Sequence, residues 1–152
     1  MPIRQVTPKS AINAYFNKRL QMVKSAMIES LAYVGEKALK QARTGRTGRT
    51  GHRYKDQTGN LTSSIGYCIL DNGRVVFESD FASVLNGKEG SREGRDYLRK
   101  LISENSSGLV FIMVAGMPYA QYVEAMNLDV LESAEMLAKR MLPQILKRLK
   151  LD

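Results

Sequence analysis

The sequence predicts one α+β domain over residues 1–152, with a small antiparallel-type twisted sheet of about three or four strands beside a long N-terminal helix and a C-terminal helix. Three observations predict this class. Apolar residues recur at helical spacing over residues 8–42. An alternating segment with an Asp-Asn-Gly turn follows over residues 61–79, and a second helical pattern ends the chain. We expect the helices to lie on one face of the sheet.

The first predicted element is an amphipathic helix from Pro8 to Ala42. Thr7 is a suitable cap, and Pro8 suits the first helical turn because its missing N–H would have no partner there. Gly35 is the expected point of a bend or break. A helix of this length would measure about 50 Å, which is more than a domain of this size needs, so one end should project or pack on a neighbouring subunit. The apolar stripe comprises Ile12, Phe16, Leu20, Val23, Met27, Leu31, Val34 and Ala38.

A basic segment follows the helix. It contains three copies of Arg-Thr-Gly and lacks an apolar anchor that would repay the entropy of ordering, so residues 43–57 are predicted to form a mobile basic loop. Its guanidinium groups suit phosphates or an acidic neighbour in an assembly, but a solvated linker explains them as well. The candidate contact residues for DNA, another anion or an assembly partner are Arg43, Arg46, Arg49, Arg53 and Lys55.

The middle of the chain predicts a β-hairpin. Alternation over 65–70 indicates a strand, Asn72-Gly73 supplies the positive φ angles of a tight turn, and residues 74–79 form the return strand. Residues 86–94 are predicted to be a loop. A short helix over 96–104 should follow, with Tyr97, Leu98, Leu101 and Ile102 as its inner face.

The last third predicts one more strand and two helices. Residues 109–115 form a continuous apolar run with β-branched members, which indicates the most buried strand. A short helical stripe over 119–126 follows, with Tyr119 and Tyr122 expected to lock it onto the sheet. Asp129 is the expected cap of the last helix, in which Pro143 should cause a kink near residues 141–142.

Composition excludes several classes. Apolar residues make up 43% of the chain and charged residues 25%, as in an ordinary globular protein. No apolar run approaches the ~20 residues that span a bilayer, and residues 1–6 lack the apolar core of a signal peptide. The only cysteine, Cys68, has no partner for an internal disulfide, which favours synthesis in a reducing cytoplasm. We therefore expect no membrane partner.

The net charge of +8 is uneven. Residues 1–60 hold 12 Lys/Arg and 3 Asp/Glu, whereas residues 61–152 hold 11 and 12. An excess of this kind indicates an anionic partner, such as nucleic acid, an acidic protein surface or a membrane surface. Solvated lysines on a helix would explain part of it.

The chain offers little for catalysis. It has one histidine, His52, inside the predicted mobile loop, and one cysteine, Cys68, among apolar strand residues. Metal ligation needs clustered ligands, and nucleophilic catalysis needs a positioned base. We therefore predict a non-enzymatic protein with no metal and no cofactor. A nuclease or toxin would need a carboxylate cluster that the sequence does not show.

Two segments resemble one known family. Residues 56–66 (Asp-Gln-Thr-Gly-Asn-Leu-Thr-Ser-Ser-Ile-Gly) and residues 118–124 (Pro-Tyr-Ala-Gln-Tyr-Val-Glu) resemble, in the same order, the two signatures of the minor tail or tail-completion proteins of long-tailed bacteriophages and prophages. The order of predicted elements along the chain is similar too. The signature residues are Thr58, Gly59, Asn60, Leu61, Ile65, Tyr119, Ala120, Tyr122, Val123 and Glu124.

The resemblance implies a virion structural protein with a tail-terminator-like fold. Such proteins act in rings at the neck or the head-proximal end of the tail, complete the tail and join it to the head. The expected partners are further copies of the chain, for example in a hexamer, then neighbouring neck and tail-tube proteins, with non-specific contact to DNA. Ala125-Met126 replaces the glycine and small residue that usually follow the family's glutamate. The alternative is a small nucleic-acid-binding protein that uses the Arg-Thr-Gly repeats.

Overall fold

The computed structural model of the chain describes residues 3–4, 6–44, 54–125 and 129–149. Their three strands form one antiparallel sheet in the order β2-β1-β3. The expected α+β class is confirmed. The elements in chain order are α1 (Lys9–Thr44), α2 (Asn60–Ser63), β1 (Ile65–Asp71), β2 (Arg74–Glu78), α3 (Lys88–Ser103), β3 (Leu109–Ala115), α4 (Ala120–Ala125) and α5 (Glu132–Arg148).

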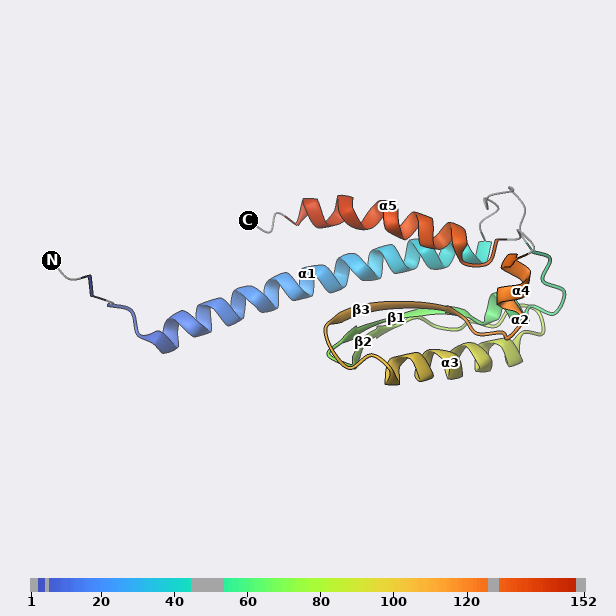
Figure 1. Ribbon diagram of the computed structural model, residues 1–152, viewed down its shortest axis with the longest axis horizontal. Coiled ribbons are helices and arrows are strands. Elements are labelled where there is room, and N and C mark those ends of the chain that lie inside the picture. The colour runs from blue at the N-terminus through green and yellow to red at the C-terminus, as the bar shows by residue number, and fades with distance from the viewer. Residues whose placement is uncertain (1–2, 5, 45–53, 126–128, 150–152) are drawn as a thin grey trace.

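Helices cover both faces of the sheet (Figure 1). The second half of α1 crosses one face, with α5 alongside it, and α3 covers the opposite face. The prediction that the helices share one face is therefore wrong. The reason lies in β1, where Tyr67 faces α1, whereas Cys68 and Leu70 face Leu98 of α3. Because both sides of this strand are apolar, both need a cover.

The central strand β1 is the most buried of the three. Its first six residues are all buried, whereas Val114 is the only buried residue of β3. The prediction that residues 109–115 form the most buried strand is wrong, because β3 lies at an edge of the sheet. The composition of a strand does not reveal its place in the sheet. The other edge strand, β2, is exposed along its whole length, although Val75, Val76 and Phe77 are apolar.

The predicted hairpin turn is confirmed. Asn72 and Gly73 both adopt positive φ angles, of 50° and 81°, between β1 and β2. Two-residue hairpin turns of this kind match the twist of the flanking strands, and Asn-Gly adopts them at low cost. The pairing shifts register between Ile69 and Leu70, so that Val76 lies at an irregularity.

Gly35 does not break α1, which is continuous through it. Instead it admits the Tyr67 ring, since a Cβ at this position would lie 2.3 Å from a ring carbon. That ring stacks between Phe77 and Phe111, with centroid separations of 5.6 and 5.4 Å. Its hydroxyl donates a hydrogen bond of 2.7 Å to Glu36 of α1. Burial, and then the Glu36 carboxylate, raise the pKa of Tyr67. The glycine thus fixes α1 on the sheet.

The helix α3 begins at Lys88, eight residues before the predicted helix, so most of the predicted loop over 86–94 is wrong. Two helical positions of α3 need glycine because other segments pass close to them. A Cβ on Gly90 would lie 1.9 Å from the Asn60 carbonyl oxygen, and one on Gly94 would lie 2.5 Å from that of Ser64. The inner face contains Leu98 as predicted, but Tyr97 is exposed.

The first half of α1 projects past the rest of the described chain (Figure 1). The helix has 36 residues and is therefore about 54 Å long. Over residues 9–22 every side chain is exposed except that of Ile12, which is half-buried. The salt bridge of 3.1 Å between Lys24 and Asp71 marks the place where α1 passes the hairpin turn. The expected projection of one helix end is observed.

The last helix, α5, is continuous through Pro143. Asp129 accepts hydrogen bonds from the backbone N–H of Ser133, at 3.0 Å, and from the hydroxyl of the same residue. The predicted role of Asp129 at the start of this helix is confirmed. Ala134 is fully buried in a cluster with Ala38 and Ala42 of α1, where three small side chains allow the two helices to approach closely.

Candidate site where the two signature segments meet

Residues 56–66 and 118–124, about 60 residues apart in sequence, lie side by side in the structure. Thr58 and Leu61 from the first segment and Tyr119 and Val123 from the second line one cavity of about 240 Å³, whose remaining wall is the stretch 54–57. The backbone N–H groups of Gly116 and Met117 hydrogen-bond to the backbone oxygen and the hydroxyl of Ser64, at 3.1 and 3.4 Å. The shared cavity thus brings the two signatures together, and the two hydrogen bonds hold the chain directly before the second one.

The first segment is held by its own side chains. Asp56 accepts hydrogen bonds from the N–H groups of Gly59, at 2.9 Å, and Thr62, at 2.7 Å. Gly59 has φ +81°, and a Cβ there would lie 2.0 Å from the Val84 carbonyl oxygen. Only glycine tolerates both conditions. Gly59 thus makes a turn that leads first into α2 and then into β1.

Polar side chains of the same segment connect it to its neighbours. The Asn60 side-chain oxygen accepts the N–H of Gly90 in the first turn of α3, at 3.1 Å, and the Ser63 hydroxyl accepts the N–H of Val84, at 2.9 Å. Leu61 and Ile65 are buried in the core with Tyr54. The described contacts of this signature are structural, since they fix α2 and α3 against the sheet.

The second segment packs through its small residues. Ala120 is buried and Val123 is half-buried, whereas Tyr122 is 72% exposed and Tyr119 is 40% exposed. The prediction that Tyr119 and Tyr122 lock α4 onto the sheet is therefore wrong for Tyr122. Tyr119 lines the shared cavity, where burial, and then the carboxylates of Asp56 and Glu89, raise its pKa.

Glu124 of the second segment has a structural role that the sequence did not reveal. One of its carboxylate oxygens accepts the backbone N–H groups of Leu131, at 2.9 Å, and Glu132, at 2.7 Å. These N–H groups belong to the first turn of α5, where they lack a partner within the helix and where a negative charge is favoured. Glu124 therefore caps α5 from a distance in sequence.

Replacing Glu124 with alanine should lower the free energy of unfolding by about 1–2 kcal/mol, the usual cost of losing a helix cap. Glu124→Gln is the matched control, because it keeps an acceptor oxygen and should lose less than the alanine variant. Urea unfolding followed by far-UV circular dichroism measures both changes. Equal losses in the two variants, or none in either, would contradict the capping role.

Some residues of the predicted basic loop belong to the described fold. Arg43 lies in α1, and its guanidinium donates hydrogen bonds to the carbonyl oxygens of Ala82, at 2.6 Å, and Ile65, at 3.5 Å. At the other end Tyr54 is buried and its hydroxyl lies 2.9 Å from that of Thr62. Residues 43–44 and 54 are thus part of the ordered fold, and Lys55 is exposed. Arg46, Arg49, His52 and Arg53 lie outside the described residues.

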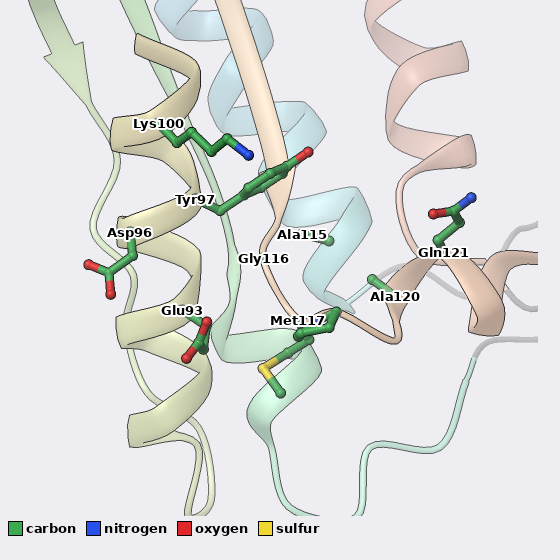
Figure 2. Close-up of a pocket in the computed structure, with 10 residues that line it drawn as sticks. Glu93, Asp96, Tyr97, Lys100, Ala115, Gly116, Met117, Ala120 and Gln121 are labelled. Carbon is green, nitrogen blue, oxygen red and sulfur yellow. The ribbon is translucent and has the colours of Figure 1, made fainter. Parts of the chain in front are cut away.

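A second cavity, of about 510 Å³, lies between α3 and the connection from β3 to α4 (Figure 2). Tyr97 and Lys100 extend from α3 towards β3, and Met117 lies on the opposite wall. Glu93 and Asp96 add two carboxylates. Sequence reasoning missed this cavity because it placed Glu93 in a loop. Its lining contains neither histidine nor cysteine.

Cys68 is fully buried, and burial together with the nearby Glu78 carboxylate raises the pKa of its thiol to about 11. Since the thiolate is the reactive form, the folded protein should not react with an aromatic disulfide reagent at pH 8 and should react after unfolding. In the unfolded chain the thiol ionises near pH 9, so stability should fall as pH rises from 9 towards 11. Reaction of the native protein as fast as of the unfolded chain would contradict this burial.

The described residues contain no group of three or more His, Cys, Asp or Glu that could hold a metal ion. No described helix is both long and apolar enough to cross a membrane.

The geometry defines a class of protein by its architecture: a three-stranded antiparallel sheet between α3 and α1, with α1 much longer than the sheet it covers. Comparison of the chain with models of known protein families, with curated proteins and with solved structures gave no match. What the chain does therefore has to be argued from its own residues.

Proposed function

We propose that the chain is a non-enzymatic structural protein of a long-tailed bacteriophage virion. It acts as a ring subunit at the neck or the head-proximal end of the tail, where it completes the tail and joins it to the head. The resemblance of residues 56–66 and 118–124 to the two family signatures supports this proposal. The cavity that both segments line agrees with it, because residues that act together are expected to lie together.

One observation carries the proposal: the projecting half of α1 exposes large apolar side chains that none of the residues described by the structure covers. Tyr15, Phe16, Leu20 and Met22 are each about 60% exposed (63, 59, 64 and 64%) within eight residues of one helix. Single exposed apolar residues are common, but a group on one helix is typical of an interface. Burying each of these side chains in an interface would stabilise the association by about 1.5–3 kcal/mol.

The proposed partners follow from this role. They are further copies of the same chain in a closed ring, such as a hexamer, and then the neck and tail-tube proteins above and below it. Basic residues that face the lumen would contact passing DNA without reading its sequence. The protein would be made in the bacterial cytoplasm and end in the virion.

Negative-stain electron microscopy of the purified protein tests the proposal. We expect class averages of closed rings with an axial hole wide enough for duplex DNA. Particles of monomer size at every concentration, or closed particles without a hole, would contradict a ring subunit of this kind.

The alternative function is nucleic-acid binding through the Arg-Thr-Gly repeats. It predicts submicromolar affinity for DNA at physiological salt and a steep salt dependence, both abolished when Arg43, Arg46, Arg49 and Arg53 are replaced with serine. Of these four, Arg43 already donates to two carbonyl oxygens of its own chain, so it is a poor candidate for a phosphate contact. Fluorescence anisotropy with a labelled duplex, at several salt concentrations, decides between strong repeat-dependent binding and weak binding that the substitutions leave unchanged.

A further inference from the structure

We propose that the projecting half of α1, residues 9–22, docks on the exposed edge strand β2 of a second copy of this chain. This inference rests on the proposed function, because it names the surfaces by which one ring subunit would hold the next.

The helical surface is an extension of a stripe that is already used within the chain. Val34 and Ala38 of α1 are buried in the fold, and Ile12, Phe16 and Leu20 continue the same stripe at spacings of three and four. The first half of the stripe therefore has the composition of a buried helix face and the exposure of a surface. A second protein chain is the cover that this pattern indicates.

The charge of the helical surface constrains its occupant. The chain has no acidic residue before Glu29, whereas Arg4, Lys9, Lys18, Arg19 and Lys24 precede it. Lys24 pairs with Asp71 of its own chain, which leaves Lys18 and Arg19 exposed among the apolar side chains. Two such helix halves placed against each other would bring like charges together, which opposes their association. The occupant should combine apolar side chains with acidic ones.

The strand β2 has this combination. Val75, Val76 and Phe77 are 44, 43 and 36% exposed, although they are apolar. Glu78 is the last residue of β2, and Asp80 lies two residues further on. The Asp80 carboxylate is 83% exposed, in a loose 3.7 Å contact with Arg95. One edge of β2 faces no other strand of the described sheet. Covering such an edge with a helix is one of the ways in which proteins protect it from pairing with other strands.

Within one chain, residues 9–22 cannot contact β2. The contact between Lys24 and Asp71 places residue 24 of α1 at the hairpin turn, and residues 9–22 lead away from the sheet beyond that turn (Figure 1). The helix half therefore reaches only the β2 of another copy. A contact between two different surfaces repeats from copy to copy, and it gives a ring if the rotation closes and a filament if it does not.

Disulfide cross-linking between two single variants, Leu20→Cys and Val76→Cys, tests the proposal. The two proteins carry tags of different mass, are mixed in equal amounts and are oxidised under mild conditions. The native Cys68 is fully buried and does not compete. We expect the mixed 20–76 product to form several-fold faster than either product of two like chains. Met136→Cys in α5, a helix position with a similar exposure of 61%, replaces Leu20→Cys as the control and should give no fast product with Val76→Cys.

The outcomes separate the inference from the function on which it rests. Native mass spectrometry of the unmodified protein is run beside the cross-linking. Oligomers without a fast 20–76 product, or with a fast 20–20 product, overturn the docking of α1 on β2 and leave the ring subunit standing. A monomer at all concentrations with no 20–76 product overturns the docking and removes the support for a self-assembled ring. A fast 20–76 product that Lys18→Glu with Arg19→Glu slows, and that Glu78→Lys with Asp80→Lys restores, supports the inference.

Discussion

Replacing Gly90 with alanine should destabilise the protein by about 3 kcal/mol, the upper end of the usual cost of overpacking. In most helices the same change stabilises by roughly 0.5–1 kcal/mol, because alanine is the better helix former. The sign reverses here because the new Cβ would meet the Asn60 backbone at 1.9 Å from its oxygen and 2.6 Å from its carbon. The same backbone is held by the hydrogen bond from the Gly90 N–H to the Asn60 side chain, so it cannot move away without loss.

Thermal unfolding measures this effect, and a loss of that size should lower the melting temperature by roughly 10 °C. Gly108→Ala is the control. Its Cβ would have no neighbour within 4 Å, but its φ of +80° imposes a conformational cost of about 1–2 kcal/mol. A stabilised Gly90→Ala variant would show that α3 does not approach the Asn60 backbone closely, and would contradict the described junction of the first signature with this helix.

Replacing both Phe16 and Leu20 with glutamate should convert the assembled protein to monomers while the monomer stays folded. Two large apolar side chains would leave the interface, with a loss of about 3–6 kcal/mol, or two to four powers of ten in the dissociation constant. The monomer should not suffer, because both side chains are exposed in it. Each new glutamate would also gain a basic neighbour three or four residues later, Arg19 for position 16 and Lys24 for position 20.

Sedimentation velocity measures the assembly, and urea unfolding measures the stability of the monomer. Met136→Glu, at a similarly exposed position of α5, is the control and should leave the assembly unchanged. If the double variant assembles as the unmodified protein does, the projecting half of α1 is not an interface. If both variants assemble less, the effect comes from added negative charge and not from the α1 surface.

Local patterns were enough to predict much of the fold. The stripe from Ile12 to Ala38 predicted α1 to within two residues at its end, and Asn72-Gly73 predicted the hairpin turn. The alternation over 65–70 predicted the strand β1. In each case the signal lies in the spacing of neighbouring residues, which is all that one sequence provides.

The misses come from contacts between distant residues. Gly90 and Gly94 indicated a loop, but they lie in α3. Glycine is needed at these positions because the Asn60 and Ser64 backbones pass close to them. The run 109–115 indicated the most buried strand, but its place at a sheet edge depends on topology. In the same way, nothing near Glu124 in the sequence showed that its carboxylate would cap α5.

The candidate site was predicted in part. The residues of the two signature segments identify them in the sequence, but the cavity that both segments line does not follow from the sequence. Two residues of the expected mobile loop have partners in the fold: Arg43 donates a hydrogen bond to the Ala82 carbonyl oxygen, and Tyr54 packs in the core. Such partners lie 39 residues away or come from several elements, so a local pattern does not reveal them.

Native mass spectrometry of the unmodified protein over a wide range of concentrations tests whether copies of this chain assemble with one another and bury the exposed half of α1. We expect a single closed oligomer, a hexamer or a ring of another fixed size, that persists on dilution to the micromolar range. A monomer at every concentration, with the apolar half of α1 left in water, would contradict it.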